Sequence, residues 1–261
     1  MLTELERIVT TVGSLLLQWR ESGQIEGKWD GSQFKSHSDL MAHEKLAEQL
    51  KNLAPEIPII SEEDQASWVD FRPERHWLID PIDGTASFAQ DYLGFVTQVA
   101  LMVENAPVLA AIYAPALKST YLAECGRGAF LNGVRLFRQQ TFPPTTLIDN
   151  YPEPRGVALQ AYNELGFTNY IECGSISLKI CKVADGMADL FFKNVIVHDW
   201  DLAAPQLVLE EAGGILRDIN GKKIRYDSDY NQSGIVAAAS EGACMRFVSW
   251  YNNFIKRGTS Q

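Results

Sequence analysis

The segment HWLIDPIDGT, residues 76–85, is the most informative stretch of the chain. Its first four residues predict a short buried strand that ends at Asp80. The proline that follows fixes the backbone and removes an amide, so Asp80 and Asp83 can be held facing one point. Gly84 permits a sharp turn, and Thr85 offers a hydroxyl beside the free amides of a helix start, where phosphate oxygens bind. The segment favours a site for a hard cation and a phosphate, although a solvated turn or a helix cap is the alternative interpretation.

Further acids end other elements of the chain. Glu62 and Glu63 follow the short apolar stretch 57–60, where a surface charge run is the alternative interpretation. Asp201 follows Trp200 and is expected to open a helix, where an N-cap is the alternative role. Acids at the ends of several separate elements predict one shared, oxygen-rich metal site.

The hydrophobic periodicity predicts a layered α/β (α+β) protein with mixed sheets. Helices are expected at residues 5–23, 40–53, 156–165, 175–184, 201–212 and 241–256. Strands are expected at residues 57–60, 76–79, 95–103, 108–113, 120–123, 189–192, 215–217 and 234–238, with hairpin turns at Asn132-Gly133 and Asn220-Gly221. We expect two lobes, an N-terminal α+β lobe of residues 1–141 with most metal ligands and a C-terminal α/β lobe of residues 142–261 with Asp201 and substrate contacts.

Composition limits the partners and the compartment. The chain has 261 residues, is 46% hydrophobic and carries a formal charge of −10. It holds no apolar window of the roughly 18–20 residues that a membrane span needs, and acidic residues stand near its N-terminus, so we expect a cytoplasmic protein without a membrane partner. The negative charge argues against a nucleic-acid polymer as partner. A small anionic substrate would need divalent cations on carboxylates to reverse the local field.

Together these motifs resemble the inositol monophosphatase superfamily. The resemblance rests on residues 80–85 preceded by Trp77, on Glu62-Glu63 one strand upstream, and on Trp200-Asp201-x-Ala-Ala followed by EEAGG at 210–214. It covers nearly the whole chain and implies the layered αβαβα sugar-phosphatase fold. It also implies lithium-sensitive hydrolysis of a phosphate monoester by metal-activated water, with two or three Mg²⁺ ions. Because the family is often dimeric, a homodimer is the expected assembly.

The resemblance assigns roles residue by residue. It implies that the metal ligands are Glu62, Asp80, the Ile82 carbonyl, Asp83 and Asp201. It implies catalytic roles for Asp39, Glu62 and Thr85, with Asp39 orienting Thr85 towards the attacking water, although Ser36 stands where the family has threonine. The substrate-binding residues that we predict are Asp83, Gly84, Thr85, Gly174, Ser175, Lys193 and Asp201.

Three segments indicate the substrate. GSISLK at 174–179, SEED at 61–64 and HDWDLAA at 198–204 resemble the 3'(2'),5'-bisphosphate nucleotidases of sulfur assimilation. Lys193 stands where inositol phosphatases have a glutamate, and an ammonium favours a second negative group. We therefore expect adenosine 3',5'-bisphosphate as substrate.

Other functions stay open at this stage. Inositol 1-phosphate is the second choice of substrate, followed by histidinol phosphate or a sugar phosphate. A non-catalytic binding subunit of the same fold is disfavoured because Glu62, Asp80, Asp83 and Asp201 are all present. A nucleotide-binding oxidoreductase is disfavoured because no Gly-x-Gly-x-x-Gly follows a strand.

Overall fold

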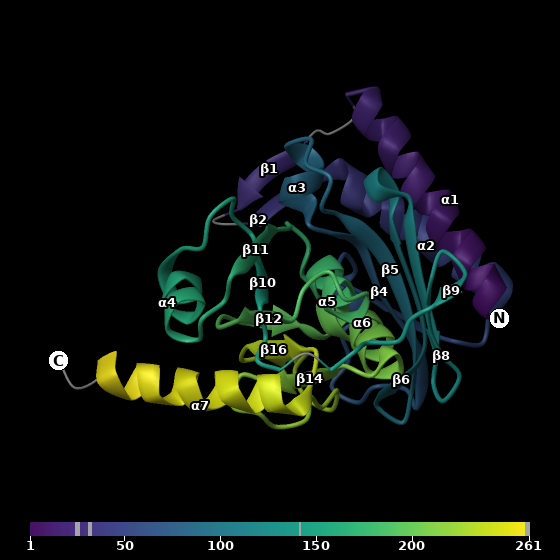
Figure 1. Cartoon of the computed structure of the whole chain (residues 1–261). Coiled ribbons are helices and arrows are strands. Elements are labelled where there is room, and N and C mark those ends of the chain that lie inside the picture. Colours follow the sequence, from purple (N-terminus) through teal and green to yellow (C-terminus); the bar gives the residue numbers. More distant parts are fainter. Residues whose placement is uncertain (24–26, 31–32, 141, 259–261) are drawn as a thin grey trace.

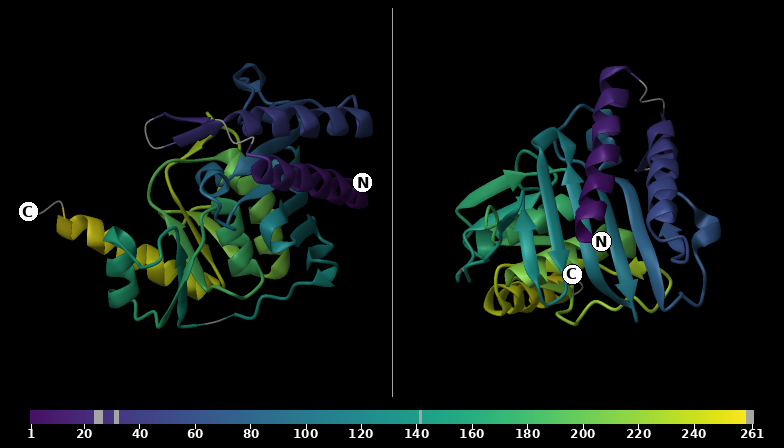
Figure 2. Two further views of the ribbon diagram at one scale, coloured as in Figure 1. Left: turned by 90° about the horizontal axis from the view of Figure 1, so that it is seen from above. Right: turned by 90° about the vertical axis from the view of Figure 1, so that its right-hand side faces the viewer.

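The computed structural model describes residues 1–23, 27–30, 33–140 and 142–258, which form five alternating layers of helices and sheets (Figure 1). The first layer consists of α1 (Leu2–Glu21) and α2 (His37–Leu53). Figure 2 shows both helices lying across one face of the larger sheet. Leu5, Val12 and Leu16 of α1 are fully buried against that sheet, as the three- and four-residue spacing of apolar side chains requires.

The second layer is a seven-stranded sheet whose strands lie side by side in chain order from β3 to β9. The β3–β4 pair is parallel, and all later neighbours are antiparallel. The strands are β3 (Ile59–Ser61), β4 (Arg75–Asp83), β5 (Val96–Val103), β6 (Ala106–Ala114), β7 (Ser119–Glu124), β8 (Gly128–Leu131) and β9 (Val134–Arg135). Strand β4 is buried along almost its whole length and continues past the expected end at Asp80 to Asp83, so both acids lie in the buried part of the strand.

The third layer consists of α5 (Ile176–Ala184) and α6 (Asp199–Ala212), which lie between the two sheets (Figure 1). The fourth layer is a five-stranded mixed sheet with the order β11-β10-β12-β16-β14. Its strands are β10 (Thr146–Asp149), β11 (Asn169–Glu172), β12 (Leu190–Lys193), β14 (Ile215–Asp218) and β16 (Ile235–Ala238). Helices α4 (Gly156–Glu164) and α7 (Glu241–Gly258) cover its outer face as the fifth layer. The predicted αβαβα fold with mixed sheets is therefore confirmed.

Short elements complete the chain. A hairpin pairs β1 (Gly27–Asp30) with β2 (Gln33–Ser36), and a two-stranded sheet pairs β13 (Val197–His198) with β15 (Asn231–Gln232). Helix α3 (Thr85–Ala89) and the 3₁₀ turns η1 (Gln65–Ser67) and η2 (Pro115–Leu117) lie in connections. None of the helices that the structure describes is both long enough and apolar enough to cross a membrane.

The structure corrects several expected elements. The sequence patterns missed the β1–β2 hairpin and strands β10 and β11. Asn220-Gly221 does form a turn, in which the Gly221 amide donates to the Asp218 carbonyl, but it is not a tight hairpin, because the partner of β14 is the distant β16. The division into lobes 1–141 and 142–261 stays a prediction, and its boundary residue 141 lies outside the described residues.

Candidate active site

A β-bulge in β4 places Asp80 and Asp83 on the same face of the sheet. Asp80 lies opposite Gln98 of β5, whereas Asp83 lies opposite Val96, so three steps along β4 match two along β5. In a regular strand, residues three apart point to opposite faces, and one extra residue restores the common face. Ile82 accordingly packs with the α1–α2 core. Both carboxylates can therefore face the α5–α6 layer.

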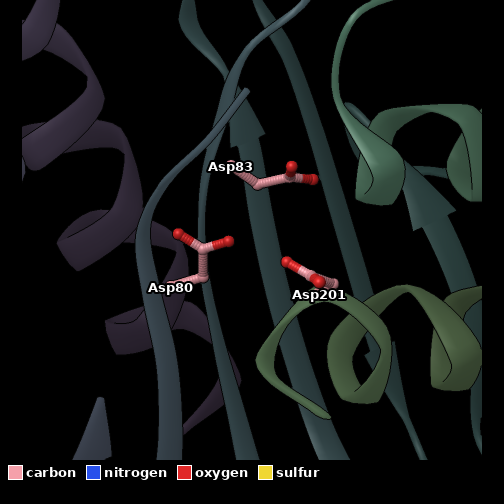
Figure 3. A group of neighbouring side chains, drawn as sticks. All are labelled: Asp80, Asp83 and Asp201. Carbon is pink, nitrogen blue, oxygen red and sulfur yellow. The ribbon is translucent and has the colours of Figure 1, made fainter. Parts of the chain in front are cut away.

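The third carboxylate comes from α6. Asp201 is the third residue of that helix, so the expectation that it opens the helix is wrong: the N-cap is His198. The Asp201 carboxylate accepts a hydrogen bond from the His198 amide at 2.8 Å. Ligand oxygens of Asp80, Asp83 and Asp201 all lie within 4.8 Å of one another (Figure 3). Strand β4 and helix α6, which are far apart in the chain, thus converge on one point.

This cluster is short of positive charge and of hydrogen-bond donors. Asp80 is buried, its Oδ1 accepts from the Ile82 amide at 3.0 Å, and its Oδ2 has no hydrogen-bond partner among the described residues. Burial, and next the Glu62 charge, raise the pKa of Asp80 well above its usual range. Burial, and next the Asp83 charge, raise the pKa of Asp201 to about 8. A buried carboxylate oxygen without a hydrogen-bond partner, beside two more acids, fits a hard divalent cation, because such cations prefer oxygen ligands.

Asp83 differs from its neighbours because the start of α5 supplies it with donors. Its Oδ2 accepts from the Ser175 hydroxyl and the Ser177 amide, both at 2.6 Å, and its Oδ1 accepts from the Ile176 amide at 3.2 Å. Ser175 is also the N-cap, since its oxygen accepts from the Leu178 amide. The predicted substrate-binding residue Ser175 thus contacts Asp83 directly, and its contact with substrate stays a prediction.

Glu62 lies beside the cluster rather than within it. It follows β3 and is partly exposed. Its carboxyl group is nevertheless surrounded by protein. This burial and, second, the Asp201 charge raise the pKa of Glu62 well above its usual range. Among the described residues, the group whose ligand oxygens lie within 4.8 Å of one another consists of Asp80, Asp83 and Asp201 and does not include Glu62. Metal ligation by Glu62 stays a prediction.

Thr85 and Asp39 lie as the resemblance implies. The Thr85 hydroxyl is within hydrogen-bonding distance of Asp39 Oδ1, at 3.1 Å, and of the Ile82 carbonyl oxygen, at 3.0 Å. Gly84 precedes α3 with φ of +89°, and a Cβ there would lie 2.8 Å from the Gly94 carbonyl oxygen. Glycine is therefore required at the turn. The side chain of Ser36 lies outside the described residues.

A buried lysine, Lys179, was missed as a site residue. It is fully buried in α5, donates to Asn150 Oδ1, and lies 4.9 Å from the centroid of the Phe191 ring. Burial lowers its pKa to about 8. The charge of Lys193, at the end of β12, partly offsets the raised pKa of Asp201 and adds to the lowering of the Lys179 pKa. No local sequence signal marks it, because a lysine in the predicted helix 175–184 looks like any other helix residue until its burial is known.

A cavity of about 730 Å³ opens nearby but does not contain the acids. Its lining includes Gly94, Asn150, Cys173 and Gly174, and none of the three aspartates. Asn150 and the Gly174 carbonyl are also the hydrogen-bond partners of Lys179. The acid cluster, with its unpaired oxygen, rather than this cavity defines the candidate site.

Comparison with known proteins agrees with this geometry. The model of the inositol monophosphatase family matches residues 2–249. The chain is 35% identical over 193 residues to the 3'(2'),5'-bisphosphate nucleotidase CysQ of Salmonella typhimurium, covering 72% of this chain and 78% of that one. It is 30% identical over 223 residues to a fructose-1,6-bisphosphatase/inositol-1-monophosphatase of Thermotoga maritima, covering 83% and 84%. The structure of an IMPase from Thermotoga maritima superposes with a TM-score of 0.80 at 24% identity, over 96% of each chain.

Proposed function

The chain belongs to the inositol monophosphatase family, and we propose that within it this protein is a magnesium-dependent 3'(2'),5'-bisphosphate nucleotidase acting on adenosine 3',5'-bisphosphate. Membership makes the chain a phosphatase, a hydrolase of phosphate monoesters in a metal-dependent family. The observation that carries the substrate is the match to CysQ nucleotidases, which reaches 234 residues, or 87% of this chain, at 32% identity in the Shigella flexneri relative.

The acid cluster would hold the cations. Asp80, Asp83 and Asp201 would be ligands, with Glu62 and the Ile82 carbonyl completing the set, for two or three Mg²⁺ ions. The unpaired Oδ2 of buried Asp80 supports this assignment. Bound Mg²⁺ supplies a lowered pKa for attacking water and neutralises charge on the leaving oxygen. Asp83, held by the start of α5, would keep its carboxylate in one orientation.

Thr85 and Asp39 would orient the attacking water. When the Thr85 hydroxyl donates to Asp39, its oxygen is left as an acceptor for a water proton. The competing acceptor is the Ile82 carbonyl, and it is withdrawn if that oxygen ligates a cation. The pair would thus position water through hydrogen bonds. Backbone amides after Gly84 would hold phosphate oxygens at a turn where no side chain fits.

Lys193 would select a substrate with a second phosphate. Its positive charge acts on Asp201, where it partly offsets the rise in pKa that burial and the Asp83 charge cause, and its side chain is partly buried at the end of β12. An ammonium donates hydrogen bonds and attracts an anion, whereas a neutral polyol gains less from it. A partly desolvated charge-assisted hydrogen bond contributes about 1.5–3 kcal/mol, or roughly ten- to a hundredfold in kcat/KM.

A substrate panel with a matched variant tests the proposal. We expect wild-type protein to release phosphate from adenosine 3',5'-bisphosphate faster than from inositol 1-phosphate, and to lose the activity when EDTA removes magnesium. We expect Lys193→Glu to lower kcat/KM for the bisphosphate about ten- to a hundredfold and to spare inositol 1-phosphate. Equal effects on both substrates would remove Lys193 as the selector. Lithium at millimolar concentration is expected to inhibit, as the family resemblance implies.

Inositol-1-monophosphatase activity is the second candidate function. The Thermotoga maritima relative, named for fructose 1,6-bisphosphate and inositol 1-monophosphate phosphatase activities, supports it at 30% identity over most of both chains. A wild-type preference for inositol 1-phosphate or fructose 1,6-bisphosphate in the same panel would select this candidate.

A further inference from the structure

The connection between β3 and β4, residues 62–74, begins with the acid Glu62 and is tied to the helix that carries Asp201. This strap, as we call residues 62–74, contains the turn η1 and the side chains of Trp68 and Arg72. Both contact the residues around the start of α6. The strap therefore links the segment that carries Glu62 to the helix that carries Asp201.

Trp68 joins the two acids most directly. Its indole N–H donates to the Ser61 carbonyl at 2.7 Å, and Ser61 immediately precedes Glu62. Its ring lies 4.9 Å from the Trp200 ring, centroid to centroid, and Trp200 immediately precedes Asp201. One side chain thus touches the neighbours of both acids.

Ser61 is a fixed anchor for Glu62. Its hydroxyl lies 2.8 Å from His43 Nδ1 and accepts from the Glu63 amide at 3.3 Å, while its amide donates to the Ser67 hydroxyl at 3.1 Å. Contacts from α2 and from the strap therefore fix the backbone from which Glu62 leaves the sheet. A shift of Trp68 would be transmitted to Glu62 through this anchor.

Arg72 makes the second tie. Its Nη2 donates to Asp199 Oδ2 at 2.6 Å and to the Ser228 carbonyl at 3.0 Å, and both charged side chains of the ion pair are almost fully buried. Its guanidinium lies 3.9 Å from the centroid of the Tyr230 ring. Asp199 is the first residue of α6 and accepts a further bond from Gln232 at 2.7 Å. The strap thus reaches α6 two residues before Asp201.

From this geometry we propose that Trp68 and Arg72 are positioning residues that hold Glu62 at the right separation from Asp201 for cation binding. The inference rests on the proposed function, because it needs the cation site. Partners that orient metal ligands commonly change metal affinity about ten- to a hundredfold when they are replaced. A purely structural role would change the melting temperature without changing affinity for the metal.

Binding of Mn²⁺, followed by the electron paramagnetic resonance signal of the free ion, tests the inference without turnover. We expect Trp68→Leu to weaken Mn²⁺ binding about tenfold, and Trp68→Phe, which keeps a ring but loses the indole N–H, to weaken it less. The control is Phe71→Leu, because Phe71 is 94% exposed on the same strap, and it should bind as wild type does. In kinetics, the variants should need more metal for half-maximal rate, with the substrate KM at saturating metal unchanged.

Arg72→Lys keeps the inference falsifiable if Trp68→Leu does not fold. Lysine keeps the charge beside Asp199 but loses the planar contact of the guanidinium with the Tyr230 ring, so we expect weaker Mn²⁺ binding of the same order. Arg75→Lys, at an exposed position three residues on, is its control. Wild-type affinity in the folded Trp68 and Arg72 variants would overturn the inference. Wild-type protein whose Mn²⁺ binding is insensitive to Asp201→Asn would instead refute the proposed cation site.

Discussion

At the scale of single residues, the three aspartates of the site have unequal support. Asp83 receives three hydrogen bonds from the start of α5, whereas Asp80 keeps a buried oxygen with no partner in the described parts of the chain. Asp201 receives one amide bond, from His198. The repulsion among these acids is therefore least compensated at Asp80 and Asp201, where a cation would stabilise most.

The raised pKa of Asp201 predicts that Asp201→Asn increases the free energy of unfolding of the metal-free protein, and that the increase depends on pH. Because the folded-state pKa is about 8, above the unfolded value, the stability that the protonated acid contributes is complete below about pH 4 and is lost as pH rises towards 8. Asparagine does not ionise, so the variant does not lose stability in this way as pH rises. In EDTA we expect it to exceed wild type in free energy of unfolding by at least about 1.4 kcal/mol at pH 8, the value of one pKa unit, and by less at pH 5.

Denaturant titrations at the two pH values measure this difference. Added Mg²⁺ should reverse the order at pH 8, because wild type alone keeps the full ligand set. A gap between the two proteins that does not change between pH 5 and pH 8 would show that Asp201 does not titrate in this range.

The acids and their convergence on one site were predictable from the sequence, but the contacts that support each acid were not. Asp80, Asp83 and Asp201 stand in motifs that can be read directly, although β4 continues past Asp80 to Asp83 and α6 begins two residues before Asp201. The bonds from Ser175 and Ser177 to Asp83 depend on how α5 docks on β4, which no local pattern encodes. Lys179 looked like one more helix residue, and only its burial shows that it is part of the site's surroundings.

At the scale of elements, the site depends on the close approach of two loops. The loop before β5 and the turn before α5 meet at glycines: a Cβ on Gly94 would lie 2.8 Å from the Gly174 amide nitrogen. Gly84, at the turn that carries the acids, is packed against the Gly94 carbonyl from the other side. The turns at Gly84, Gly94 and Gly174 therefore pack directly against one another through their backbones.

We predict that Gly94→Ala separates these turns and lowers both stability and activity. Backbone cannot move aside as a flexible side chain can, so we expect a loss of about 1–3 kcal/mol in unfolding free energy and at least a tenfold loss in kcat/KM. Gly126→Ala is the control: it meets nothing within 4 Å and carries only the cost of a left-handed backbone, so its stability should fall while its activity stays. Full activity of Gly94→Ala would show that this contact does not position the site.

Long periodic elements were predictable, whereas short ones and the bulge were not. The spacing of Leu5, Val12 and Leu16 is a strong signal for α1, but β10 and β11 are only four residues long each. The bulge after Asp80 is hidden because a spacing of three would place the two aspartates on opposite faces in any regular strand. It becomes visible only from the pairing with β5.

At the scale of the whole molecule, the site lies where the larger sheet meets the middle helical layer. One core cluster packs residues of both sheets around α5 and α6, including Leu78 of β4, Leu202 of α6 and Phe191 of β12. The layered order was predictable, because helices and strands alternate along the chain in the way the resemblance implies. The division of the chain between two lobes stays a prediction.

The central claim is that Asp80, Asp83 and Asp201 together hold the divalent cations of a phosphatase. Anomalous diffraction from crystals grown with Mn²⁺ tests it most directly, because the signal locates the metal itself. We predict an anomalous peak within bonding distance of carboxylate oxygens of all three aspartates, and we predict that this peak is lost in Asp201→Asn crystals. Active protein whose Mn²⁺ peaks lie elsewhere, with none in bonding distance of these three side chains, would contradict the account.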